Sequence, residues 1–240
     1  MKMHDFFIRF IRRTKLVVSG SNRIMLFFFL LCLSFLTYAE TISFKADSMQ
    51  GTAGSKSDTT TLEGNAFVKT QDMEIFAQTI SLSGSDFRFI NAQTKVSVVN
   101  SKTKMEFTCD RLFYDRESKT ARLQGKVHLN DTENKVTADA QIIEYDEHNE
   151  TAVLQINVNL QQKNNTCTGA YAVYKKTEQL LELSGSPKIV QGNDTFKAQE
   201  ITLNMNTQEI TMSGRVQGSI STTQNSGKNS NQQKGGQDAN

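Results

Sequence analysis

The sequence predicts an all-β domain built from about six two-stranded repeats of about 30 residues. Three observations indicate it: a recurring glycine-centred segment, a second segment recurring in step with the first, and strict alternation of apolar and polar residues within the copies. The composition agrees, because Pro occurs once, Trp is absent and the polar residues that favour turns are abundant. Helical content is therefore expected to be close to nil.

The glycine-centred segment supplies the second strand of each unit. Its six copies are centred on Gly64, Thr94, Gly125, Ile156, Gly185 and Gly214, at spacings of 30, 31, 31, 29 and 29 residues. Apolar residues stand two before, two after and four after almost every centre, with polar residues between them, which is the period of a half-buried strand. The glycines allow close backbone approach or a bend, and we expect them to be sheltered strand positions.

The other recurring segment supplies the first strand of each unit. It is centred on Ala46, Ala77, Thr108, Ala138, Thr168 and Ala198, at spacings of 31, 31, 30, 30 and 30 residues. The segment ends in apolar or aromatic residues and then meets a polar turn such as DRESK or DEHNE. Phe113, Tyr114, Tyr145 and Tyr174, at these strand ends, are expected to pack at edges rather than gate a ligand site.

Stacking of the repeats follows from their amphipathic character. A single hairpin cannot bury its apolar face alone, so six in series must stack on their neighbours or fold over on themselves. The apolar positions of all units then line one continuous interior.

The two ends of the chain differ in composition from the repeats. Residues 1–39 combine a basic stretch, the 13 non-ionisable residues Ile24 to Leu36, and small residues at Thr37 and Ala39, which is typical of a signal peptide cleaved before Glu40. An uncleaved inner-membrane anchor is the alternative, although the run is shorter than the roughly 20 residues of a membrane span. Residues 40–220 form the repeat domain, and residues 221–240 are too polar to repay their ordering entropy and are expected to be a disordered tail.

Charge and motifs exclude several classes of function. Residues 1–39 hold six of the 27 Lys and Arg residues and one of the 25 Asp and Glu residues, which leaves 21 basic against 24 acidic residues. A nucleic-acid partner is therefore not expected. No nucleophile-elbow, phosphate-loop or dinucleotide motif occurs, and His128 and His148 have no neighbour at ligand spacing. We expect no enzyme, no metal and no cofactor.

Cys109 and Cys167 remain in the exported chain, where a disulfide is permissible. In a regular array of units their strands would lie about two strand spacings apart, roughly 9 to 10 Å. That exceeds the usual Cα separation of a disulfide, about 7 Å at most, so the sequence leaves the pairing open.

A pattern of the form A-D-x-x-x-x-Y, polar turn, L-x-G-x-V-x-L is clearest in residues 136–155 (VTADAQIIEYDEHNETAVLQ) and 120–129 (TARLQGKVHL). From Thr41 to about Ile220 the series resembles the LptA/OstA family of periplasmic lipopolysaccharide-transport proteins. The sequence departs from the family pattern at Thr94 and Ile156, which replace the central glycine, and at Thr108 and Thr168, which replace the first-strand alanine. The long basic N-terminal stretch makes the anchored LptC-like relative the second choice.

The resemblance implies an open, twisted β-jellyroll whose apolar interior shields the acyl chains of lipopolysaccharide or a similar glycolipid. It also implies a bridge from the inner to the outer membrane, in which jellyroll domains of membrane components, or further copies of this chain, join by edge-strand pairing. The residues expected to contact lipid are Leu62, Val68, Val96, Val98, Leu123, Val127, Leu129, Leu154, Val158, Leu160, Leu183 and Ile189. The alternative is an exported β-solenoid scaffold or surface adhesin whose core is filled by its own side chains.

Overall fold

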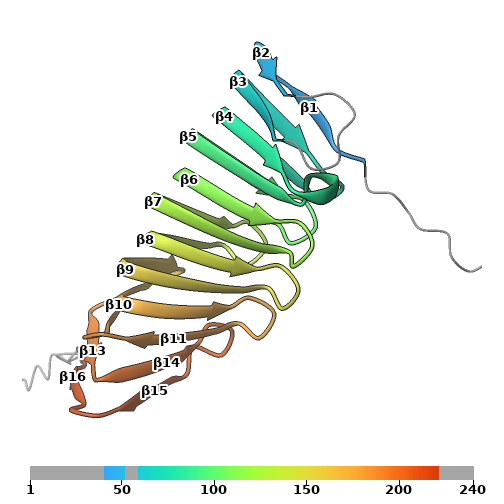
Figure 1. The fold of residues 1–240 in the computed structure, drawn as a ribbon. Coiled ribbons are helices and arrows are strands. Elements are labelled where there is room, and N and C mark those ends of the chain that lie inside the picture. Colours follow the sequence, from blue (N-terminus) through green and yellow to red (C-terminus); the bar gives the residue numbers. More distant parts are fainter. Residues whose placement is uncertain (1–40, 52–58, 222–240) are drawn as a thin grey trace, which may run out of the picture. The chain divides into compact units, whose positions relative to one another are not determined.

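The computed structural model describes residues 41–51 and 59–221, which form one antiparallel sheet of 16 strands folded over on itself (Figure 1). The prediction of an all-β fold is confirmed, since the helical content of these residues is the three-residue 3₁₀ turn η1 (Ser85–Phe87). The expected signal peptide, residues 1–39, and the expected tail, residues 221–240 apart from Ser221, lie outside the described residues.

The strands fall into long central ones and short terminal ones. They are β1 (Ser43–Lys45), β2 (Ser48–Gln50), β3 (Thr60–Lys69), β4 (Met73–Ser83), β5 (Phe89–Asn100), β6 (Met105–Asp115), β7 (Thr120–Asp131), β8 (Val136–Asp146), β9 (Thr151–Gln162), β10 (Asn165–Lys175), β11 (Leu180–Ser184), β12 (Lys188–Gln191), β13 (Asp194–Lys197), β14 (Glu200–Asn204), β15 (Ile210–Ser213) and β16 (Gln217–Ser219).

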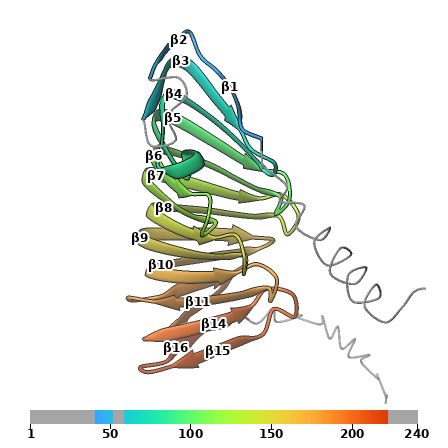
Figure 2. The same cartoon turned by 45° about the vertical axis from the view of Figure 1, so that its right-hand side comes forward.

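Strands that are neighbours in sequence are neighbours in the sheet from β3 to β11, so both strands of every unit enter the same ladder (Figure 2). The ladder is continuous but not closed, because β1 and β2 pair only with β3 at one end, and β15 and β16 pair only with β14 and β13 at the other. The expected open sheet built from two-stranded repeats is therefore confirmed.

A fold line, which we call the corner, crosses the sheet at the predicted strand centres. It consists of six residue pairs: Gly64 with Asn65, Thr94 with Lys95, Gly125 with Lys126, Ile156 with Asn157, Gly185 with Ser186, and Gly214 with Arg215. All twelve residues have positive φ, between 45° and 81°. Two successive left-handed residues reverse the local pleat and shift the ladder register, as where two residues of β6 face three of β7. The chain thereby turns from one layer of the sheet into the other.

The corner divides the sheet into two layers that face each other. In β3, β5, β7 and β9, layer A contains the segment before the corner, such as residues 120–124 of β7, and layer B contains the segment after it, such as residues 127–131. In β4, β6, β8 and β10 the layer B segment comes first. Beyond β10 no strand within the described residues spans both layers. There, β11, β14 and β15 continue layer A, while β12, β13 and β16 continue layer B.

The glycine prediction is correct for two of the four glycines and wrong for the other two. Gly64 and Gly125 lie inside β3 and β7 and are half-buried, as expected. Gly185 and Gly214 are exposed in bends between strands, where β11 is separate from β12 and β15 is separate from β16. The continuous strand β10 lies beside the bend at Gly185 and pairs with β11 before it and with β12 after it. At all four positions the positive φ favours glycine, which has no Cβ to clash.

Candidate lipid-binding interior

The space between the layers is apolar and is lined by the residues that the sequence predicted to contact lipid. All twelve belong to one continuous core, and each is at most 3% exposed. Leu62, Leu123 and Leu154 face inward before the corner, whereas Ala66, Val127 and Val158 face inward directly after it. The structure thus brings the predicted residues together, and their own side chains fill the interior.

The interior loses its cover at both ends of the ladder. At the first end, Phe44 and Met49 lie opposite inward-facing residues of β3 but are 43% and 57% exposed, because no strand covers them. At the other end Val216 and Ile220 are exposed, and Met212 is half-buried. Apolar side chains therefore lie at both ends next to strands with unpaired edges.

Two lines of turns run along the side opposite the corner, one for each layer. The turns of layer A follow β4, β6, β8, β10 and β14, and we call them rim A; those of layer B follow β3, β5, β7, β9 and β12, and we call them rim B. The inward alternation of each strand carries on into the rims, where apolar residues give way to polar ones. Asn100, Asp131 and Gln162 end β5, β7 and β9, and all three are buried.

The rims meet along a line that we call the seam, defined by Asp131, Glu133, Asn134 and Asn165 of rim B with Tyr174, Lys176 and Gln208 of rim A. The Tyr174 hydroxyl donates to Oδ2 of Asp131 over 2.7 Å, and Nδ2 of Asn134 donates to the Tyr174 oxygen over 3.3 Å. Nδ2 of Asn165 donates to Oε1 of Gln208 over 2.5 Å. The sheet is thus open in its backbone ladder and closed by side chains.

Lys176 provides the ionic contact of the seam. Its ammonium donates to Glu133 across the seam and lies 3.3 Å from Oε2 of Glu150 on its own rim. Its side chain is 5% exposed, and burial alone would lower its pKa, but the hydrogen bond to Glu133 and the charges of Asp131 and Glu150 outweigh burial and raise it. The Lys176 side chain therefore carries its charge in a buried setting.

Buried tyrosines lie just inside the rims. Tyr114, Tyr145 and Tyr174 are at most 2% exposed, which agrees with the expectation that they pack, whereas Phe113 lies on the outer face and stacks on Phe89 at 5.7 Å. Burial raises the pKa of Tyr174, and its hydrogen bond to Asp131 adds to this. Burial also raises the pKa of Tyr145. The neighbouring Thr103 hydroxyl of rim B opposes part of this rise.

The seam residues were missed by the sequence analysis, which treated the polar residues after each strand as parts of turns. A signal was present, because Thr70, Asn100, Asp131 and Gln162 each stand six residues after a strand centre and so continue the inward period of two. These are polar side chains at inward positions, and their place in the repeat sets them apart from ordinary turn residues.

The two cysteines are buried and unbonded. They lie on β6 and β10, separated by β7, β8 and β9, which corresponds to about four strand spacings, or ~19 Å. The expectation of two spacings was wrong because both strands of each unit enter the same ladder. Burial raises the pKa of the Cys109 thiol to about 11 and that of Cys167 to about 12, so both are poor nucleophiles at neutral pH.

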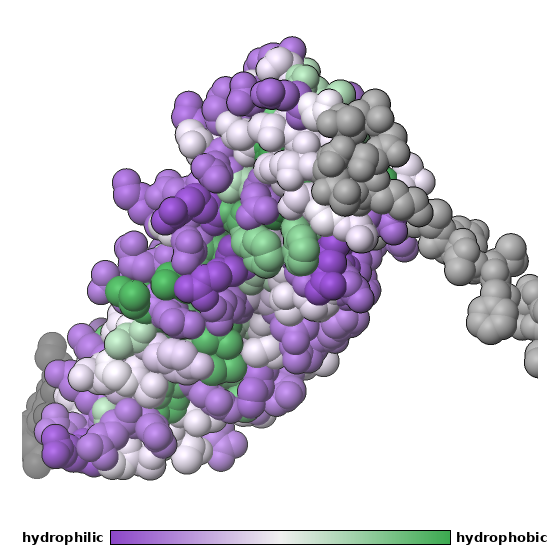
Figure 3. Space-filling model, in the orientation of Figure 1, coloured by the Kyte–Doolittle hydropathy of each residue, from purple (hydrophilic) through white to green (hydrophobic). Residues whose placement is uncertain are grey.

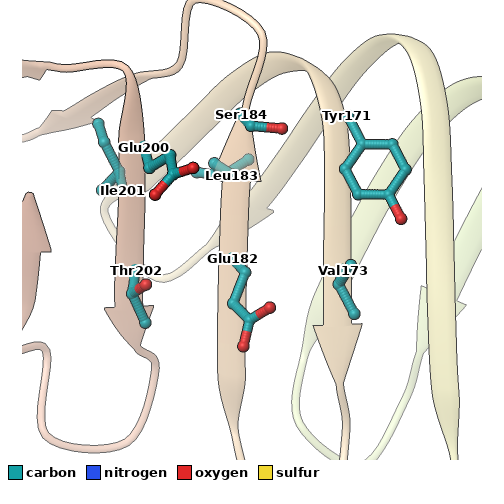
Figure 4. A pocket seen from close by; sticks show the side chains of 8 residues that line it. All are labelled: Tyr171, Val173, Glu182, Leu183, Ser184, Glu200, Ile201 and Thr202. Carbon is teal, nitrogen blue, oxygen red and sulfur yellow. The ribbon is translucent and has the colours of Figure 1, made fainter. Parts of the chain in front are cut away.

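The face of the molecule shown in Figure 3 is mostly hydrophilic, with some hydrophobic side chains among the hydrophilic ones. A depression of about 300 Å³ lies on the outer face of layer A (Figure 4). Its lining residues are Tyr171, Val173, Glu182, Leu183, Ser184, Glu200, Ile201 and Thr202. Glu182 is paired with Lys175 at 2.7 Å, and two of the lining residues, Leu183 and Ile201, also belong to the buried core.

Two further properties concern the part of the chain that the structure describes. No helix among residues 41–51 and 59–221 is long and apolar enough to cross a membrane. Within the same ranges no group of three or more His, Cys, Asp or Glu side chains is arranged to hold a metal ion, and Nδ1 of His128 lies 2.8 Å from Oδ1 of Asp139 on the outer face.

Comparisons with known proteins assign the chain to a family. The family model described as "LptA/(LptD N-terminal domain) LPS transport protein" matches residues 45–180. No curated protein matches. Among solved structures, the chain is similar to LptH, described as the LptA homologous periplasmic component of the lipopolysaccharide transport device of Pseudomonas aeruginosa. The two are 12% identical over 76% of this chain and 96% of LptH, with a TM-score of 0.24.

The folded ladder, its apolar interior and its open ends define an open β-jellyroll domain. The family match spans more than half of the 240 residues. The chain belongs to the LptA/LptD N-terminal domain family of lipopolysaccharide-transport proteins, as the sequence resemblance predicted.

Proposed function

We propose that the chain is a periplasmic carrier or bridge that holds the acyl chains of lipopolysaccharide, or of a similar glycolipid, between its two layers. The observation that carries the proposal is the continuous apolar core, which runs through every long strand and reaches exposed apolar residues at both ends. Each buried methylene contributes roughly 0.8 kcal/mol, so an acyl chain could be held without any specific polar contact.

Edge-strand pairing would supply the partners of the bridge. The unpaired edges of β1 and β2 at one end, and of β15 and β16 at the other, are templates for adding a strand. Phe44 and Met49 would be covered by such a neighbour. We therefore infer that jellyroll domains of inner- and outer-membrane components, or a second copy of this chain in a head-to-tail arrangement, extend the ladder and its interior.

The test compares two neighbouring residues of β9, Leu160 facing inward and Gln161 facing outward. A photoreactive amino acid is placed at either position in the full chain, which is then incubated with lipopolysaccharide in detergent micelles. We expect capture of the lipid from position 160 and little from position 161, after circular dichroism has shown that both variants are folded. Equal capture from both faces, or none from position 160, would contradict the proposal.

The rival function is an exported scaffold or adhesin with a self-filled core, and the packed interior is the observation that favours it. The two proposals differ in whether the layers part for a ligand. Native mass spectrometry of the purified chain after incubation with lipopolysaccharide separates them, because a scaffold would remain free of lipid while a carrier would gain the mass of the bound molecule.

A further inference from the structure

The seam raises a question that the proposed function leaves open: how a hydrocarbon chain reaches an interior that is already filled. The apolar residues of the interior are almost fully buried, and on one long side the corner joins the layers through continuous backbone. On the other long side, side chains of the seam hold the rims together. The layers can part there without breaking any hydrogen bond of the backbone ladder.

The chemistry of the seam suits reversible opening. Asp131 keeps local donors when the rims part, because the backbone N–H groups of Glu133 and Asn134 donate to Oδ1 over 3.0 Å and Nδ2 of Asn134 donates to Oδ2 over 2.8 Å. Lys176 keeps Glu150 on its own rim. Each group therefore loses one partner and gains water, whereas an apolar closure would expose hydrophobic surface.

Partial exposure at the seam makes that exchange easier. Glu133 is 59% exposed although Lys176 is buried, so water already reaches one side of the ion pair. Pairs with an exposed partner contribute little to stability and weaken as salt screens them. The neighbouring core, in contrast, is held by apolar packing throughout.

We propose that the seam is a lateral gate: the Asp131–Tyr174 and Glu133–Lys176 contacts separate to let an acyl chain pass between the layers, and they close when the interior is empty. This inference rests on the proposed function, since it supplies the route by which the lipid reaches its site. It predicts that opening at the seam precedes, and is easier than, unfolding of the sheet.

The first test follows the seam without lipid, through the buried thiols. In the full chain, Lys176→Met and Tyr174→Phe should raise the alkylation rate of Cys167 and Cys109 several-fold, because an open seam admits reagent and returns the thiol pKa values toward the ordinary range. Peptide mapping separates these sites from Cys32. The matched control is Lys175→Met, which removes the equivalent pair with Glu182 on the outer face. Leu62→Ala controls for a general loss of stability.

Equal rates in Lys176→Met and Lys175→Met would overturn the gate, as would rates that follow global stability across all variants, including Leu62→Ala. Faster alkylation confined to the seam variants supports it.

The second test locks the seam and measures lipid capture. Glu133→Cys combined with Lys176→Cys is bridged by a bis-maleimide that alkylates both thiols and has a reducible disulfide in its spacer, and capture of lipopolysaccharide is measured from a photoreactive residue at position 160. Loss of capture on bridging, with recovery on cleavage, supports the gate. Undiminished capture would overturn the gate and leave the proposed function standing, with loading from the open ends. Absence of capture before bridging would overturn the proposed function, and the gate with it.

Discussion

The two long sides of the folded sheet join the same pair of layers by different means. At the corner, the backbone passes from layer A to layer B through pairs of left-handed residues, and the ladder stays hydrogen-bonded on either side of the bend. At the seam, the connection consists of side chains, among them a tyrosine, two carboxylates and a lysine. The corner cannot part while the chain is folded, whereas the seam can.

The difference shows how one repeat can carry two separate requirements. Strain and sterics decide which residues the corner accepts, because its φ values are positive. Polar pairing decides which residues the seam accepts, because Asp131, Asn165, Tyr174 and Lys176 are buried there and need polar partners. Substitutions at the two sides should therefore change different properties of the protein.

The largest effect is expected at the corner, from Gly125→Val. A Cβ at this position would lie 2.9 Å from Cβ of Asp110, and a β-branched residue is strained at a φ of 81°. We expect a loss of roughly 2 to 3 kcal/mol of unfolding free energy, measured by chemical denaturation. Gly192→Val is the control, since no atom lies within 4 Å of its added Cβ. Equal losses at both glycines would show that the crowding by Asp110 contributes nothing.

A smaller effect is expected at the seam, from Tyr174→Phe. The change removes the hydroxyl that donates to Asp131, whose carboxylate retains its local donors, so we expect a loss of about 1 kcal/mol in unfolding free energy. Tyr171→Phe, on the exposed outer face of the same strand, should have no measurable effect. A similar loss from both variants would mean that the cross-seam hydrogen bond is not the cause.

The corner can also be tested in the opposite direction, with Ile156→Gly. Ile156 is β-branched, has a φ of 67° and is 51% exposed. Its left-handed backbone is therefore strained, and burial of its side chain offsets only part of that cost. Relief of this strain should add about 1 kcal/mol to the unfolding free energy. The larger conformational entropy that glycine loses on folding should offset part of that gain. Gln155→Gly, one residue earlier on the strand, should destabilise instead. Destabilisation by both changes would contradict this account of the corner.

The smallest effect concerns pH and an ion pair that runs along rim A rather than across the seam. Arg88 donates to Asp115 through Nε and Nη2, and these hydrogen bonds lower the pKa of the Asp115 carboxyl. The stability that this ion pair contributes is present above the ordinary pKa of aspartate, about 4. It is lost as the pH falls through the lower pKa that Asp115 has in the folded state. Asp115→Asn should flatten the acid limb of a stability-versus-pH curve. An unchanged acid limb would show that the pair contributes nothing.

Much of the fold could be predicted because it depends on local period. Alternation around Gly64, Gly125 and the other centres determined which residues face inward, and every such residue before the last unit is buried, including Pro187. The centre itself was harder to place, since strict alternation puts Ile156 inside the sheet while two left-handed residues turn it outward. Propensity alone does not reveal a left-handed pair at threonine or isoleucine.

The seam could not be predicted because it depends on contacts between distant parts of the chain. Tyr174 and Asp131 are 43 residues apart, and Glu133 and Lys176 are separated by the same number. Pairing at that distance requires knowing how tightly the two layers close. The repeat alone shows only that polar residues occupy inward positions at the strand ends.

The unclosed ladder also has a consequence for how the protein loses its structure. In the backbone ladder, each strand from β4 to β9 is hydrogen-bonded only to the strand before it and the strand after it, so its ladder pairing comes from two neighbours, whereas β1, β2, β15 and β16 have only one. We therefore expect local unfolding to begin with the terminal strands, at both ends of the ladder. Backbone amide exchange would be slowest in β6 to β9, and would quicken step by step toward β1 and β16.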